Sequence, residues 1–155
     1  MNLFVKIILC VIICAGLGLA SGFSTVSEIT GWFQQIEKPS WNPPNWIFSP
    51  VWTTLYILMG IAAGLIWHSN DERKGRALLL FALQFILNLG WSFIFFNQHE
   101  IGWALAEIIV MLLLIIVTAI AFYKIKPLAG YLMIPYILWV SFATCLNGAI
   151  WLLNK

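Results

Sequence analysis

The sequence has 155 residues, of which 62% are apolar and only 9% are charged, and its mean hydropathy is +0.94. Soluble domains carry about 25% charged residues, so this composition excludes an ordinary water-soluble globular protein. It also excludes an intrinsically disordered chain, because such chains are poor in apolar residues. The length and composition predict a single-domain integral membrane protein, in which nine tryptophans need an explanation.

Five apolar stretches are long enough to cross about 30 Å of hydrocarbon as helices, which rise 1.5 Å per residue. They lie at about positions 3–23, 47–67, 77–97, 101–123 and 128–153. No alternating pattern of about ten residues recurs, which argues against a β-barrel. Lipid offers the backbone no hydrogen-bond partners, so we expect the five stretches to be helices, in which the backbone groups bond to one another. The sequence therefore predicts an all-α integral membrane protein, a bundle of five transmembrane helices in one domain over positions 1–155.

The basic residues are divided unequally between the two ends of the predicted bundle. Two lie at one end, Lys38 and Lys155, and six lie at the other: Lys6, Arg73, Lys74, Arg76, Lys124 and Lys126. Lys and Arg near helix ends stay in the cytoplasm, so we expect a cytoplasmic N-terminus and an extracytoplasmic C-terminus and first connection. The net charge of +2 follows from this topology and indicates no nucleic-acid partner.

The first apolar stretch has a second interpretation as a secretory signal. Lys6 precedes its apolar core, and Gly18 and Ala20 form a small-x-small sequence of the kind found at cleavage sites. We favour a retained helix. All three cysteines lie within apolar stretches, so they are expected to pack as small apolar residues, and we expect no disulfide, metal or cofactor: Cys10, Cys14 and Cys145.

The first connection, positions 24–46, is rich in proline and tryptophan. Its prolines exclude a long helix (Pro39, Pro43 and Pro44). The simpler interpretation of its tryptophans is an interfacial anchor, because tryptophan collects at the headgroup level. The proline content is high for a flexible loop, so we favour a rigid aromatic lid over the outward end of the bundle.

Polar and aromatic residues inside the stretches recur at helical spacing. One set lies in the third stretch (Gln84, Asn88, Trp91, Ser92, Phe95), one in the fifth (Tyr136, Trp139, Ala143, Asn147), and others are Trp52, Tyr56 and Glu107. Hydrogen bonds between helices explain Gln84 and Asn147. Trp91 and Trp139 lie too deep for interfacial anchors, so a pocket for a flat apolar ligand stacked on indoles is indicated.

Six short motifs are spread over nearly the whole chain: Lys38-Pro39-Ser40-Trp41-x-Pro43-Pro44, Pro50-Val51-Trp52, Leu55-Tyr56-x-x-Met59-Gly60, Asn88-x-x-Trp91, Gly102-Trp103-Ala104-Leu105 and Pro135-Tyr136-x-x-Trp139. Together they resemble the tryptophan-rich sensory protein/translocator protein family. The resemblance implies five tightly packed helices, a first connection that closes a pocket, a homodimer, and binding of porphyrins and benzodiazepine-type ligands.

The resemblance also implies a set of ligand-binding residues, in which Asn88 donates to a ligand carbonyl: Trp32, Phe33, Pro44, Trp52, Tyr56, Asn88, Trp91, Glu107, Trp139 and Ala143. Bacterial relatives are reported to convert protoporphyrin under light and oxygen, which makes Trp52 and Trp139 candidate catalytic residues. Two positions depart from the animal pattern. Gly148 stands where a tyrosine of the sterol motif is expected, which puts a sterol site in doubt, and Leu89 replaces an aromatic residue.

Four functions follow as hypotheses: a binding, transport or sensory protein for porphyrins, a light-dependent porphyrin-degrading enzyme, a sterol or lipid carrier, and a structural partner. Conventional catalysis has no nucleophile and base pair to support it. Burying porphyrin carboxylates at mid-bilayer is costly, so we expect them near Lys38 and Asn42. The spacings Gly18/Gly22 and Gly60/Gly64 permit close helix contact, either at a dimer interface or within one chain.

Overall fold

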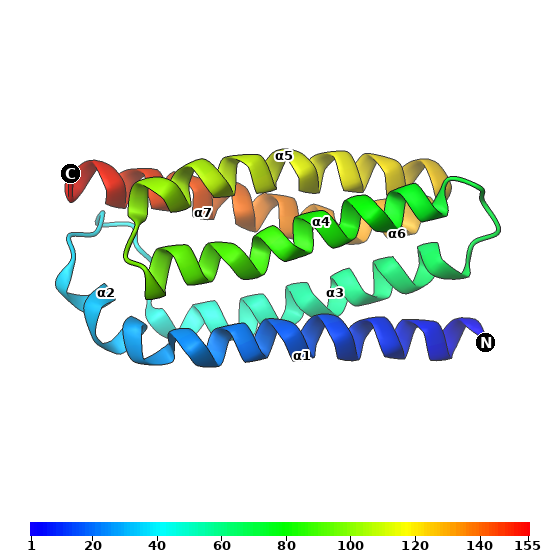
Figure 1. Ribbon diagram of the computed structural model, residues 1–155, viewed down its shortest axis with the longest axis horizontal. Helices are drawn as coiled ribbons and strands as arrows, with labels where there is room; N and C mark the ends of the chain where they lie inside the picture. Colours follow the sequence, from blue (N-terminus) through cyan, green and yellow to red (C-terminus); the bar gives the residue numbers. More distant parts are fainter.

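The computed structural model describes all 155 residues and is a bundle of helices with no strand (Figure 1). Its elements are α1 (Leu3–Thr30), α2 (Trp32–Gln35), η1 (Asn45–Ile47), α3 (Phe48–His68), α4 (Lys74–Ser92), η2 (Phe93–Asn97), α5 (Ile101–Ile125), α6 (Pro127–Leu132) and α7 (Ile134–Leu153). Five helical segments are long and apolar enough to cross a membrane, since η1 continues into α3, α4 into η2, and α6 into α7. The predicted all-α fold with five spans is confirmed.

The first helix is longer than predicted, because α1 continues to Thr30 rather than ending at position 23. Polar residues fit into this end of the helix because their hydroxyl groups donate to backbone carbonyls one turn back. The Ser24 hydroxyl lies 2.7 Å from the Ser21 carbonyl oxygen, and the Thr25 hydroxyl lies 2.8 Å from that of Gly22. The prediction that the first connection begins at position 24 is therefore wrong for positions 24–30.

The lid, which we define as positions 31–47, connects α1 to α3 at the end of the bundle that also holds the C-terminus (Figure 1). It contains only short helical turns, α2 and η1, with an extended segment between them. Pro39, Pro43 and Pro44 lie in that segment and cannot donate a backbone hydrogen bond. The connection is thus shorter than predicted, because positions 24–30 belong to α1.

Two irregular segments interrupt helices that the sequence predicts as continuous. Met133 separates α6 from α7, where Pro135 occupies the first turn of α7 and supplies no backbone N–H. The end of the third predicted stretch, Phe93–Asn97, forms a π-helix, η2. The other helix ends lie within three residues of their predicted positions.

Glycines bring α1 and α3 into close contact over the half of the bundle that lies away from the lid. A Cβ atom at Gly60 would lie 2.5 Å from the Cα of Val11, and one at Gly64 would lie 2.6 Å from the Cα of Ile7. The ring of Tyr56 occupies the space that a Cβ at Gly18 would need. The Gly60/Gly64 pair therefore packs within one chain, as does Gly18, whereas Gly22 has no neighbour within 4 Å.

The six basic residues predicted to share one end do so, at the end opposite the lid (Figure 1). Hydrogen bonds join the segments there: Lys6 Nζ lies 3.5 Å from the Trp67 carbonyl oxygen, and Arg73 Nη2 lies 3.1 Å from that of Lys124. Arg73 also pairs with Asp71 at 2.7 Å, and the hydrogen bonds from Arg73 lower the pKa of the Asp71 carboxyl to about 2.

Candidate functional site

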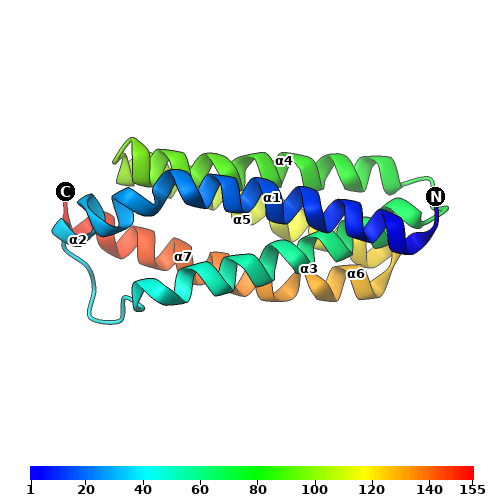
Figure 2. The same ribbon diagram turned by 90° about the horizontal axis from the view of Figure 1, so that it is seen from below.

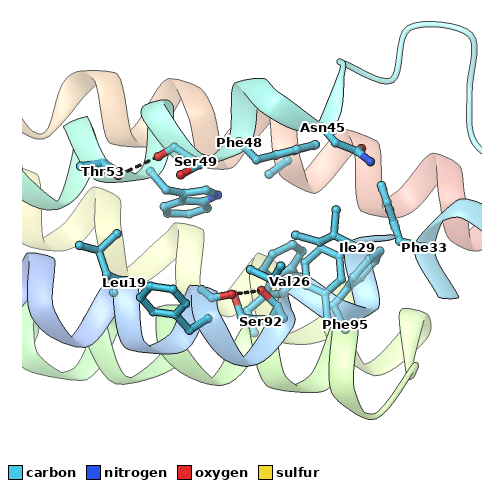
Figure 3. A pocket seen from close by; sticks show the side chains of 18 of the residues that line it. Leu19, Val26, Ile29, Phe33, Asn45, Phe48, Ser49, Thr53, Ser92 and Phe95 are labelled. Atoms are coloured by element: carbon cyan, nitrogen blue, oxygen red, sulfur yellow. Dashed lines mark hydrogen bonds between the residues drawn. The ribbon is translucent and has the colours of Figure 1, made fainter. Parts of the chain in front are cut away.

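A cavity of about 240 Å³ lies among α1, α3, α4, η2 and α7 in the half of the bundle near the lid (Figure 3). A buried water needs only roughly 10–15 Å³ measured in this way, so the cavity has room for a small molecule. Its walls are mainly apolar and aromatic, and its few polar side chains include Asn45, Ser49 and Ser92. This composition is typical of small-molecule pockets.

Six of the ten residues expected to bind a ligand line this cavity: Phe33, Trp52, Tyr56, Trp91, Trp139 and Ala143. They come from the lid, α3, α4 and α7, which are far apart in the sequence. The helical spacing of the aromatic residues thus indicated the inner faces of these helices correctly. Whether these residues bind a ligand stays a prediction.

The other four expected residues lie outside the cavity wall. The Trp32 ring stacks on the His99 ring with centroids 4.2 Å apart, and Pro44 precedes η1. Glu107 lies on α5 beside Gly90, and both of its carboxyl oxygens are buried without a hydrogen-bond partner. Asn88 is buried behind Tyr56.

A chain of hydrogen bonds runs behind the cavity, beginning at Tyr56. The Tyr56 hydroxyl donates to Asn88 Oδ1 at 3.0 Å, Asn88 Nδ2 donates to the Tyr136 hydroxyl at 2.9 Å, and that hydroxyl donates to Gln84 Oε1 at 2.7 Å. All four side chains are buried. The amide of Asn88 is therefore engaged with two tyrosines and does not line the cavity, so its expected hydrogen bond to a ligand carbonyl stays a prediction.

A second hydrogen-bond chain fixes the wall formed by Trp91. The indole N–H of Trp91 donates to Asn147 Oδ1 at 3.0 Å, and Asn147 Nδ2 donates to the Ile101 carbonyl oxygen at 2.9 Å. The Trp91 ring also stacks on Phe95 with centroids 5.2 Å apart. The expectation that Asn147 and Gln84 join helices through hydrogen bonds is confirmed.

Trp139 differs from Trp91 because its indole N–H is buried and has no hydrogen-bond partner. Its ring lies edge-to-face against Phe48, with centroids 6.0 Å apart. Unpartnered buried donors are uncommon in proteins, and each one calls for an explanation. Trp139 therefore brings a flat apolar surface to the cavity wall, and its N–H is buried without a partner.

The lid is fastened to the rest of the bundle at several points. The backbone N–H of Glu37 donates to Asn154 Oδ1 at 3.0 Å, and Asn154 Nδ2 donates back to the Glu37 carbonyl oxygen at 2.9 Å. Within the lid, Lys38 Nζ donates to the carbonyl oxygens of Phe33 and Ile36 at 2.6 and 2.8 Å. These bonds hold Phe33, which is only 3% exposed, over the cavity end.

Replacing Asn154 with alanine is expected to loosen the lid without unfolding the bundle. The change removes two hydrogen bonds to Glu37, each worth about 0.5–1.5 kcal/mol. Amide hydrogen exchange at Glu37 should accelerate about tenfold, a change that mass spectrometry of lid peptides can follow. Asn70→Ala is the matched control, since Asn70 is exposed at the opposite end of the bundle. Equal exchange in the two variants would contradict this role of Asn154.

The wall that α1 contributes was not predicted from the sequence. Leu19, Val26 and Ile29 of α1 line the cavity (Figure 3). They recur at helical spacing, but residues that face lipid have the same apolar chemistry, so only the structure separates the two faces. Phe48 was missed for the same reason.

Residues 10–152 of the chain match the model of the TspO/MBR family. The chain is 41% identical to the tryptophan-rich protein TspO of Chlorobaculum tepidum over 157 aligned residues, which cover 96% of this chain and 98% of that protein. It is 35% identical to the translocator protein of Sus scrofa, over 89% of this chain and 83% of that protein. A tryptophan-rich sensory protein of Cereibacter sphaeroides is 40% identical over 75% of this chain and 72% of its own length. The chain is therefore a multi-pass membrane protein that belongs to the TspO/MBR family.

Proposed function

We propose that this chain binds flat hydrophobic molecules, porphyrins of the protoporphyrin IX type and benzodiazepine-type ligands, in the cavity near the lid, and transports or senses them. The observation that supports this is the convergence of three deep indoles, Trp52, Trp91 and Trp139, on one cavity. Indole rings offer large flat faces that stack on aromatic ligands.

The polar edge of such a ligand belongs at the lid end of the cavity. Asn45 and Ser49 line that end (Figure 3), and carboxylates placed deeper in the membrane would lose their hydration at high cost. Lys38, which the sequence suggested as a partner for carboxylates, donates to lid carbonyls in this structure. We therefore infer that Lys38 affects ligand binding indirectly, by holding the lid in this conformation.

A second candidate function is light- and oxygen-dependent conversion of a bound porphyrin. The supporting observation is that Trp52 and Trp139 line the same cavity, where a porphyrin would lie against both. Trp91 is held by Asn147 through its N–H, whereas Trp139 has no such partner. A sterol carrier is the weakest alternative, because Gly148 stands at the position of the expected tyrosine.

The membrane orientation and oligomeric state are part of the same proposal. The six basic residues at the end opposite the lid favour a cytoplasmic location for that end and for the N-terminus. The lid and the C-terminus then face outward, where a ligand can reach the cavity from the outer leaflet. We propose a homodimer on the resemblance to the family alone.

A titration with protoporphyrin IX in the dark, followed by illumination in air, tests both functions on the full chain in lipid nanodiscs. Binding predicts saturable quenching of indole fluorescence. An unchanged porphyrin spectrum under light supports binding alone. Loss of the porphyrin bands that is absent in Trp52→Phe and Trp139→Phe supports the second candidate. Quenching that never saturates would contradict both functions.

A further inference from the structure

Several cavity residues on α1 also belong to the outer surface of the bundle. Leu19, Phe23 and Val26 line the cavity, yet they are 43%, 80% and 53% exposed. They lie within the span formed by α1, so the surface they share faces hydrocarbon. The cavity is therefore open on the side of α1 and is not sealed from the bilayer.

The packing of α1 against α3 explains where this side is open. The two helices touch at Gly60 and Gly64, and the Tyr56 ring lies against Gly18. One turn further towards the lid, Gly22 lines the cavity and has no heavy atom within 4 Å of its Cβ position. Figure 2 shows α1 and α3 close together near the N-terminus and separated towards the lid. The gap begins where the glycine contacts end.

The lid end of the cavity is closed by contrast. A ligand leaving through the lid would have to separate Glu37 from Asn154, and Trp32 from His99. It would also have to move the buried Phe33 away from Phe95 and Phe96. Passage beside Gly22 breaks no hydrogen bond and requires only that exposed side chains such as Phe23 change rotamer, which happens within nanoseconds.

We propose that ligands move sideways between the cavity and the hydrocarbon of the bilayer, through an opening between α1 and α3 whose width Gly22 sets. This inference rests on the proposed function and specifies its ligand class. The ligand is a flat apolar molecule already dissolved in the bilayer, with its polar groups on one edge. That edge passes nearest the lid, where Ser49 and Asn45 line the cavity.

The opening is tested by the rates of protoporphyrin IX binding and release, measured by stopped-flow indole fluorescence on the full chain in nanodiscs. In Gly22→Leu, both rates should fall at least tenfold, because a narrowed passage slows movement in both directions, whereas added bulk at the cavity wall alone would speed release. Gly16→Leu is the matched control, since Gly16 is exposed on α1, has open space around it and does not line the cavity. It should match the wild type.

A second pair of variants separates the side opening from a route through the lid. Phe23→Ala should speed both rates, whereas Asn154→Ala, which loosens the lid, should leave them unchanged. Faster exchange in Asn154→Ala together with unchanged rates in Gly22→Leu would overturn the side opening. Faster release in Gly22→Leu would also overturn it, because that result would mean that the leucine weakens contacts between the ligand and the cavity wall instead of narrowing the passage. Absence of saturable binding to the wild type would instead overturn the proposed function itself.

Discussion

Replacing Gly60 with valine is expected to destabilise the bundle strongly. A Cβ atom at this position would lie 2.5 Å from the Cα and 2.7 Å from the backbone nitrogen of Val11, so α1 itself would have to move. Overpacking of a closely packed interior costs about 1–3 kcal/mol, occasionally more. For a chain of this size, we expect the midpoint of thermal unfolding in detergent to fall by roughly 5–10 °C.

Gly16→Val is the matched control for this result. Gly16 lies on α1 and has no heavy atom within 4 Å of its Cβ position, so the substitution carries the same cost of a β-branched residue in a helix without the collision. Its unfolding midpoint should stay close to that of the wild type. Equal midpoints for the two variants would show that the contact of α1 with α3 is looser than the structure has it.

Replacing Trp139 with alanine is expected to have the largest effect on ligand binding among single truncations of the cavity wall. The change removes the buried area of the indole and a stacking surface worth about 0.5–1.5 kcal/mol beyond that area. A loss of about 2 kcal/mol of binding free energy corresponds to a roughly 30-fold rise in the dissociation constant for protoporphyrin IX. Porphyrin absorbance measures this constant.

Two further substitutions make the Trp139 result specific. Trp139→Phe keeps a smaller aromatic face, so its dissociation constant should lie between those of the wild type and the alanine variant. Trp103→Ala removes an indole that is 72% exposed on α5, away from the cavity, and should bind as the wild type does. If Trp139→Ala and Trp103→Ala bind equally well, Trp139 does not form part of the ligand site.

The sequence was sufficient for the fold and for part of the cavity wall, because both depend on patterns that a chain displays locally. Apolar stretches of sufficient length indicated the five spans, and polar or aromatic residues at helical spacing indicated the inner faces that hold Tyr56, Trp91 and Trp139. Such residues are costly against lipid, so their position inside the bundle follows from their chemistry alone.

The parts that the sequence did not reveal depend on contacts between distant segments. The end of α1 was placed too early because Ser24 and Thr25 bond to their own helix rather than ending it. Asn88 bonds to Tyr56 and Tyr136, and these partners lie 32 and 48 residues away. Small residues at Gly60 and Gly64 permit close approach, but only the structure identifies α1 as the neighbour.

The most direct test of ligand binding in this cavity is a substitution that fills the cavity without removing any part of its wall. Ala143 lines the cavity on α7, and Ala143→Phe places a ring in the space that a ligand would occupy. We expect the variant to fold with an unfolding midpoint near that of the wild type, and its dissociation constant for protoporphyrin IX to rise at least tenfold. Ala106→Phe, at an exposed position on α5, should leave binding unchanged. Unaltered porphyrin binding by a folded Ala143→Phe variant would show that the ligand does not bind in this cavity.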